Sequence, residues 1–188
     1  MENQKNNFPN YLFPLYFCRR LPRLAGDYIL GPEIQSAPLN CITQFLAIKN
    51  DKFYKLKILT IDPNDSNPSK ETIQGKILIH NEFALLNLLQ GCPGIERCYE
   101  MISDSAMEEK VEVKNSKVIT TFTGKEKRRI ILVLDAFCEK SCDWMNINTV
   151  NHEVSLQEYI SRKKLNEKDA LLIFYEIVKI VEFIHSVS

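Results

Sequence analysis

A lysine lies in the middle of an apolar run, FYKLKIL, at residues 53–59, and Glu82 follows in a leucine-rich segment, 25 positions after Lys57 (82 − 57). Alternation along a strand would place Lys57 on the same face as Lys55. A lysine amine pairs with a carboxylate, or binds a phosphate group if it faces a cleft. Two hypotheses follow: Lys57 is an ordinary solvated side chain of a strand, or it faces a cleft and holds a negatively charged group.

The composition argues against several other kinds of site. The 24 basic and 24 acidic residues cancel, so no basic surface predicts a nucleic-acid partner. The six cysteines and three histidines lack metal-ligand spacing, so we expect reduced thiols and no metal site. The apolar stretch at residues 11–18 is too short to span a bilayer and has no signal-peptide cleavage site, so we expect no membrane partner.

Short apolar runs separated by turn residues predict strands. They are YILG, ITQFLAI and FYKLKIL, at residues 28–31, 42–48 and 53–59, in meander order, with NDK as the turn between the second and the third. The run RRIILVLDAF, at residues 128–137, is rich in β-branched residues and is typical of a central strand buried on both faces. We interpret the charged residues 99–129 before it as a solvated hairpin with KVITTF as a strand.

Two segments with leucine or isoleucine at helical spacing predict helices. Asn67 as the N-cap and Pro68 in the first turn would begin the first helix, which would end before Gly91. The second runs over residues 167–185, and 11 of the 14 residues in Leu171–Ile184 are apolar, so we expect it to be buried almost all round. It would either pack onto the rest of the chain, self-associate with a second copy, or leave the chain unstable.

This order of elements resembles the N-terminal half of a protein kinase, and residues 27–186 are most similar to the Tribbles-related pseudokinases. FYKLKIL resembles the third kinase strand, HNEFALLNLL the helix whose glutamate pairs with the strand lysine, and ILVLDAFC the fifth strand and hinge. The resemblance therefore implies that Lys57 pairs with Glu82, either as an ion pair that only fixes the helix to the sheet or as part of a site for the phosphates of a nucleotide. The resemblance implies an α+β fold: a kinase-like N-lobe with an antiparallel five-stranded sheet and one main helix, then the first helices of the C-lobe. Residues 1–26 would be a flexible arm, 27–150 the N-lobe and hinge, and 151–188 the two-helix start of a truncated C-lobe.

The resemblance also implies an ATP site. Its members would be Lys57, Glu82, Gly31 of the phosphate-covering loop, Leu134 as gatekeeper, and Asp135, Ala136 and Phe137, whose backbone would meet the adenine. In the kinase family this loop has the sequence G-x-G-x-x-G, whose glycines allow backbone N–H groups to approach phosphate. Here Glu33 and Ser36 replace two of the glycines. Lys55 replaces the small alanine on which adenine lies. ATP is therefore the only cofactor implied, with at most weak binding.

The chain ends at Ser188, where a kinase would continue into the H-R-D and D-F-G motifs. Those motifs carry the base aspartate and the metal-binding residues, so the chain alone is predicted not to transfer phosphoryl groups. The resemblance implies a fragment or short form of a serine/threonine kinase-like regulatory protein of the nucleus and cytoplasm. It would act by protein interaction in signalling and transcription control, with a ubiquitin ligase or transcription regulator as partner of the full-length protein. The alternative is an ATP-binding serine/threonine kinase whose catalytic loop lies downstream.

Overall fold

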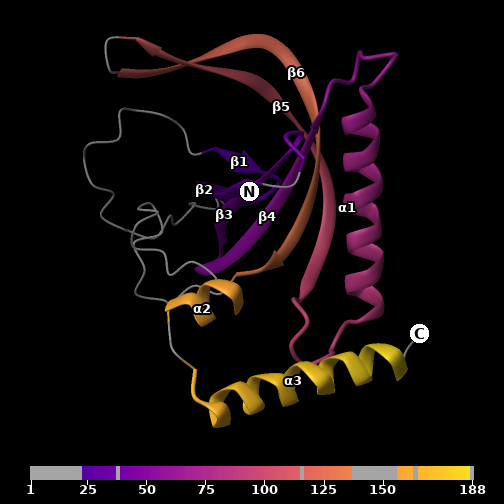
Figure 1. Ribbon diagram of the computed structural model, residues 1–188. Helices are drawn as coiled ribbons and strands as arrows, with labels where there is room; N and C mark the ends of the chain where they lie inside the picture. The colour runs from indigo at the N-terminus through magenta and orange to yellow at the C-terminus, as the bar shows by residue number, and fades with distance from the viewer. Residues whose placement is uncertain (1–22, 37–38, 115–116, 137–155, 163–164, 187–188) are drawn as a thin grey trace, which may run out of the picture.

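A computed structural model of the chain describes residues 23–36, 39–114, 117–136, 156–162 and 165–186. Its strands form one antiparallel sheet in the order β1-β2-β3-β4-β6-β5, and helix α1 lies against one face (Figure 1). The elements are β1 (Leu24–Ala25), β2 (Tyr28–Ser36), β3 (Ile42–Lys49), β4 (Lys52–Ile61), α1 (Lys70–Leu88), β5 (Cys98–Lys114), β6 (Lys117–Asp135), α2 (Leu156–Arg162) and α3 (Glu167–Ser186). The predicted α+β class, with an antiparallel sheet and one helix against it, is confirmed.

The sheet has six strands among the described residues, not the expected five. The additional strand, β1, has two residues and pairs with Tyr28 and Ile29 through a tight turn in which Gly26 has a φ of 55°. The predicted meander of β2, β3 and β4 is confirmed. Its turn between β3 and β4 has Asn50 and Asp51 at φ 50° and 58°, the left-handed pair that suits a two-residue hairpin.

The charged region predicted as a hairpin is one, but its strands are longer than expected. KVITTF and RRIILVLD belong to a single 19-residue strand, β6, which pairs with the 17-residue β5. The pairing passes from Met107–Glu126 to Glu109–Phe122, so β6 has additional residues at this point. Gly124 lies among them with a φ of 79°, the left-handed conformation that glycine adopts in one common type of β-bulge. The bulge therefore keeps one strand continuous where two were expected.

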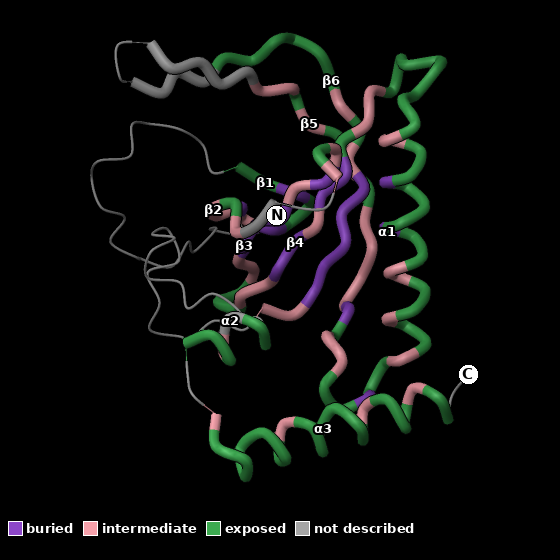
Figure 2. The backbone as a smooth tube through the Cα atoms, viewed as in Figure 1, coloured by how far each residue is buried: buried purple, intermediate pink, exposed green. Residues whose placement is uncertain are grey.

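Apolar residues are buried on both faces of the sheet. Figure 2 shows that the buried residues gather in its strands. The cluster on the α1 face is Ile42, Leu59, Ile79, Cys98, Ile130, Leu132 and Leu134, and the cluster on the other face includes Tyr28, Leu30, Phe45, Leu56, Ile58, Ile131 and Val133. Successive residues of β6 thus alternate between the two clusters. Because β6 also lies between β4 and β5, the prediction of a central strand buried on both faces is confirmed.

Helix α1 begins two residues later than the sequence suggested. Its N-cap is Ser69, whose side chain accepts a hydrogen bond from the backbone N–H of Thr72 at 3.1 Å. The predicted cap, Asn67, is instead part of a turn in which its backbone N–H donates to Asp65. Pro68 therefore precedes the cap and does not occupy the first turn. Both Asn67 and Ser69 can cap a helix, and the local turn decides between them.

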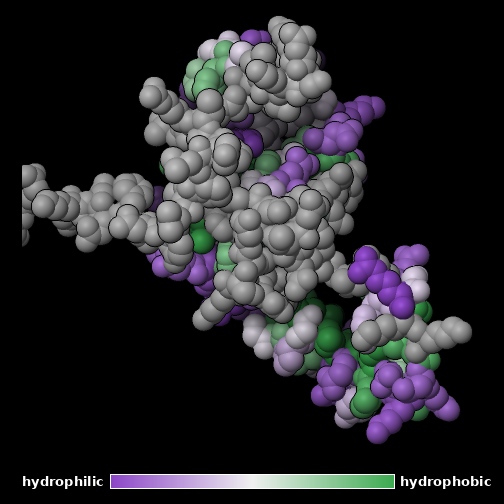
Figure 3. All heavy atoms as spheres, turned by 90° about the vertical axis from the view of Figure 1, so that its left-hand side faces the viewer, coloured by the Kyte–Doolittle hydropathy of each residue, from purple (hydrophilic) through white to green (hydrophobic). Residues whose placement is uncertain are grey.

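Helix α3 covers the predicted residues, but its predicted burial is wrong. None of its residues is buried, and Phe174 is 64% exposed. Ile180 lies against Gly94 in the loop after α1, while hydrophobic side chains show at the surface where α3 lies (Figure 3). No helix among the described residues is long and apolar enough to cross a membrane. The assignment of α2 and α3 to a C-lobe, and the division into arm and two lobes, stay predictions.

Candidate functional site

Lys57 and Glu82 meet across the interface between the sheet and α1. The Lys57 Nζ lies 2.5 Å from Glu82 Oε1, and the two side chains are 21% and 33% exposed. Lys57 lies opposite Leu132 in the register of β4 and β6, which places it beside the buried cluster under α1. The predicted ion pair is confirmed, and the hypothesis of a solvated strand lysine is wrong.

Close packing of α1 brings the two side chains together. Gly75, Ile79 and Glu82 recur at helical spacing, and the first two are buried against the sheet. A Cβ at Gly75 would lie 2.8 Å from the Sγ of Cys41 and 3.0 Å from Leu59, so a larger residue would push these side chains or the helix away. The position of Gly75 therefore fixes how near Glu82 comes to β4.

A second ion pair lies beside the first. Lys55, two positions before Lys57 on the same face, is buried, and its Nζ pairs with Oε1 of Glu96 in the loop after α1. Burial raises the pKa of the Cys98 thiol, and the carboxylates of Glu82 and Glu96 raise it further. Cys98 thus lies within the field of both pairs. The sequence analysis missed Glu96, because its loop has no periodicity. The only indication of it was Lys55, a lysine on an apolar strand that needs a carboxylate partner if it is buried.

The predicted hinge residues follow at the end of β6. Leu134 is fully buried and lies opposite Lys55. Asp135 donates its backbone N–H to the carbonyl oxygen of Arg97 at 2.9 Å and accepts a hydrogen bond from the Tyr99 hydroxyl at 3.1 Å. Contacts to residues just before and at the start of β5 therefore hold this residue by its backbone and its side chain.

The remaining predicted site residues are less informative. Ala136 is partly exposed, and Phe137 lies outside the described residues. Gly31 belongs to β2, which continues to Ser36 with two register shifts while it pairs with β3. A paired strand therefore occupies the place where the family resemblance implied a phosphate-covering loop.

The ladder shows which of these residues share one end of the sheet. Leu30, next to Gly31, aligns with Ala47, which aligns with Tyr54, which aligns with Asp135. Gly31 and the hinge therefore lie at the same end. Lys57 and its ion pair lie three positions further along β4. The part of the chain that the structure describes contains no group of side chains that could hold a metal ion.

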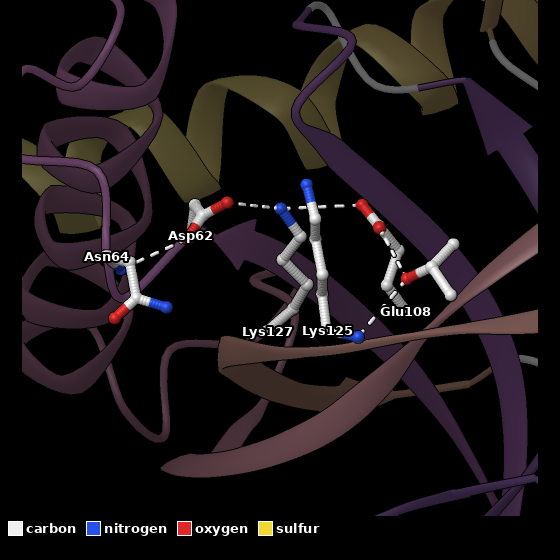
Figure 4. Close-up of polar contacts among 6 residues, drawn as sticks. Asp62, Asn64, Glu108, Lys125 and Lys127 are labelled. Carbon is white, nitrogen blue, oxygen red and sulfur yellow. Dashed lines mark hydrogen bonds and ion pairs between the residues drawn. The ribbon is translucent and has the colours of Figure 1, made fainter.

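A further polar cluster fixes the β5–β6 hairpin to the end of β4 (Figure 4). Lys127 Nζ lies 2.6 Å from Asp62 Oδ2 and 3.4 Å from Glu108 Oε1. The pKa of Asp62 is lowered mainly by the hydrogen bond from Lys127 and further by the hydrogen bond from the backbone N–H of Asn64. The pKa of Glu108 is lowered mainly by the hydrogen bond from the Thr123 hydroxyl and further by Lys127. The hydrogen bond to the Asp62 carboxylate raises the pKa of Lys127. The sequence analysis did not predict this cluster, because it depends on the register of the long hairpin.

Comparison with known proteins identifies one set of relatives. No protein-family model matches the chain. Over 166 residues it is 36% identical to serine/threonine-protein kinase 40 of Homo sapiens, 35% identical to that of Mus musculus and 34% identical to that of Xenopus tropicalis. Each alignment covers 86% of this chain and 36% of the relative, so the chain spans about a third of the length of these proteins. The predicted resemblance to a protein kinase is therefore confirmed: over most of its length, the chain is similar to serine/threonine-protein kinase 40.

Proposed function

We propose that the chain forms the N-lobe of a kinase-like regulatory protein of the pseudokinase type, which acts by protein interaction in signalling and transcription control. The similarity to serine/threonine-protein kinase 40 supports the kinase-like class. The observation that carries the kinase-like part of the proposal is the Lys57–Glu82 ion pair, because it joins a sheet to a helix as the strand lysine and helix glutamate of kinases do. The partner of the full-length protein would be a ubiquitin ligase or a transcription regulator, in the nucleus and cytoplasm.

Two features of the site favour protein interaction over nucleotide chemistry. Lys55 is buried where the family resemblance implies a small residue under the adenine, and Glu96 faces its amine. In β2, Glu33 and Ser36 stand where the family has two further glycines, and side chains at these positions hinder the close approach of phosphate to the backbone. Helix α3 adds an exposed apolar surface that supports self-association through Leu171–Ile184. Sedimentation that finds only monomer would exclude that association.

The alternative function is nucleotide binding by part of a serine/threonine kinase. The Lys57–Glu82 pair favours it, since the same pair positions the phosphates of ATP in active kinases. In that case Lys57 would bind phosphate, and the backbone of the segment after Leu134 would meet the adenine. The two functions differ in one measurable property, which is whether ATP stabilises the folded chain.

A thermal-shift titration with ATP, with and without magnesium, separates the two functions. A ligand at a hundredfold excess over its dissociation constant stabilises a protein by about 2.7 kcal/mol, a shift of several degrees in a chain of this size. The proposal predicts no shift in the wild-type chain. Lys55→Ala restores the small residue on which adenine would lie. If this variant also shows no shift, Lys55 is not the sole obstacle to adenine.

The control variants are Lys57→Met and Lys76→Met. Lys76 is an exposed lysine of α1, so its replacement should leave any ATP response unchanged. A shift in the wild-type chain that persists in Lys76→Met and disappears in Lys57→Met would establish nucleotide binding at the predicted site. That result would contradict the proposal in favour of the alternative.

A further inference from the structure

Three strand ends meet at the end of the sheet where β6 finishes. Asp135 is the last residue of β6, Lys52 is the first residue of β4, and Tyr99 lies next to the first residue of β5. Because β6 lies between β4 and β5 in the sheet, Lys52 and Tyr99 come from the two neighbours of the strand that ends at Asp135. The chain leaves the sheet after Asp135 on its way to α2 and α3. Side chains at this place can therefore act on the direction in which the chain leaves the sheet.

A β-bulge turns the Tyr99 side chain towards this place. The pairing of β5 with β6 shifts its register between Cys98 and Glu100, so Tyr99 is an additional residue in β5. In a regular strand, successive side chains point to opposite faces. Here Tyr99 packs against the buried cluster on the face opposite α1, and the next residue, Glu100, accepts a hydrogen bond from Tyr28 of that same cluster. The bulge thus places two consecutive side chains on one face, as bulges that re-aim a side chain do.

The Tyr99 hydroxyl joins the two neighbouring strand ends. It donates a hydrogen bond to Asp135 Oδ1 at 3.1 Å and accepts one from the Lys52 Nζ. A hydroxyl that accepts from an ammonium and donates to a carboxylate is polarised in one direction, which strengthens both bonds. The hydrogen bond to Tyr99 raises the pKa of Lys52, and the charge of Asp135 raises it further. The amine is therefore protonated throughout the neutral range.

The ring of Tyr99 is held independently of its hydroxyl. The Lys52 Nζ lies 4.3 Å and the Arg97 Cζ lies 4.8 Å from the ring centroid. The Tyr54 ring meets the Tyr99 ring edge to face, with 5.3 Å between the centroids, and packs in the same way against Tyr28 at 5.0 Å. These contacts remain when the hydroxyl is removed, so Tyr99→Phe tests the hydroxyl alone.

The backbone of Asp135 is fixed at the same point. Its N–H donates to the carbonyl oxygen of Arg97 at 2.9 Å, and Tyr54 of β4 lies opposite it in the register. The last residue of β6 is therefore held through its main chain by Arg97 and through its side chain by Tyr99.

We propose that Tyr99 is a positioning residue for the exit of β6: its hydroxyl, shared by Lys52 and Asp135, fixes the direction in which the chain leaves the sheet. The Lys57–Glu82 pair does not take part, because it lies on the α1 face and the Tyr99 ring lies on the other. In the proposed kinase-like protein this exit is the predicted hinge, but the role of Tyr99 does not require ATP.

Residue-resolved amide hydrogen exchange of the 188-residue chain tests this role, with the Asp135 amide as the reporter. Tyr99→Phe should lower the protection of that amide about tenfold, because a hydrogen bond to a charged group is lost, and should leave the amides of Ile131 and Val133 unchanged. Asp135→Ala should cause the same loss at this position. The double variant should add no further loss, because both changes remove one contact. Losses that add in the double variant, or unchanged protection in Tyr99→Phe, would overturn the proposal.

The matched control is Tyr28→Phe. It removes a hydroxyl from the same array of rings, but this hydroxyl donates to Glu100 of β5, at 2.6 Å, and not to β6. The protection of the Asp135 amide should therefore stay unchanged in this variant. An equal loss in Tyr28→Phe and Tyr99→Phe would show that the array of rings holds the exit, and would overturn the role of the Tyr99 hydroxyl.

The pH dependence of the exchange provides a second criterion. The hydrogen bond is strongest while Asp135 is ionised, so the difference in protection between the wild type and Tyr99→Phe should be constant near neutral pH and shrink below about pH 4. Glu100, another carboxylate on this face, is present in both proteins, and Lys52 and Arg97 stay charged throughout. A difference that does not change with pH would assign the effect to packing and overturn the proposal.

Discussion

At the scale of single residues, Lys55 and Lys57 show how a strand accommodates two lysines on a face that packs under a helix. Each amine lies beside a carboxylate from a different element, Glu96 from a loop and Glu82 from α1. A charge removed from water without such a partner costs several kcal/mol, so the lysines and their carboxylates must be placed together. The two pairs therefore specify where α1 and the following loop lie on β4.

The sequence allowed one of these pairs to be predicted. Lys57 and Glu82 followed from the order of the elements and from the resemblance to kinases. Glu96 did not, because a carboxylate in an irregular loop has no periodicity that would indicate its direction. The contacts of Lys127 depend on a hairpin register that a bulge shifts, and alternation alone does not reveal such a shift.

The Lys127 cluster predicts a specific pH dependence of stability. The folded-state pKa values of Asp62 and Glu108 are lowered, so their contribution is present above their ordinary range near 4 and is lost as the pH falls through the folded values. The pKa of Lys127 is raised, so its contribution is present below its ordinary value and is lost as the pH rises through the folded one. Both contributions are thus constant from about pH 6 to 9.

Urea unfolding of the wild type and Lys127→Met checks this sign. We expect the variant to be less stable at neutral pH and the difference to shrink towards zero well below pH 4, where both carboxylates are protonated. Lys76→Met, an exposed lysine on α1, should show no such trend. A difference between wild type and Lys127→Met that stays constant down to acid pH would show that Lys127 acts through packing and not through charge.

At the scale of elements, the start of α1 shows the limit of local signals. Asn67-Pro68 and Ser69 both fit an N-terminus, and the structure selects Ser69 because Asn67 belongs to a turn with Asp65. We expect Ser69→Ala to lower the free energy of unfolding by about 1 kcal/mol, since the N–H of Thr72 loses its acceptor. Asn67→Ala should change it by less than about 0.5 kcal/mol. Chemical denaturation of both variants decides, and the reverse order would place the cap at Asn67.

Helix α3 shows a different limit. Its composition correctly predicted a helix, because the apolar residues recur without a proline or glycine to interrupt them. Its burial was predicted wrongly, because composition states what a helix needs to cover and not what is present to cover it. The apolar residues of α3 therefore stay exposed in the described structure, and their burial requires a further surface.

At the scale of the whole molecule, the meander, α1 and the central strand could be read from the sequence because each rests on periodicity within a short window. The sixth strand and the length of the hairpin could not, because β1 has two residues and β6 continues through a charged stretch that resembles a turn. In the candidate site, the face of β4 was predictable from alternation. The paired state of β2 was not, since glycine and proline in that segment indicated a loop.

The central claim is that Lys57 and Glu82 join α1 to the sheet as they do in a kinase N-lobe. A double-mutant cycle tests it directly: urea unfolding of the wild type, Lys57→Met, Glu82→Gln and the double variant, with hydrogen exchange across residues 76–90 measured in parallel. For a partly buried pair we predict a coupling energy of about 1–2 kcal/mol and faster exchange of α1 in each single variant. Effects that add within about 0.3–0.5 kcal/mol, with unchanged exchange in α1, would contradict the claim.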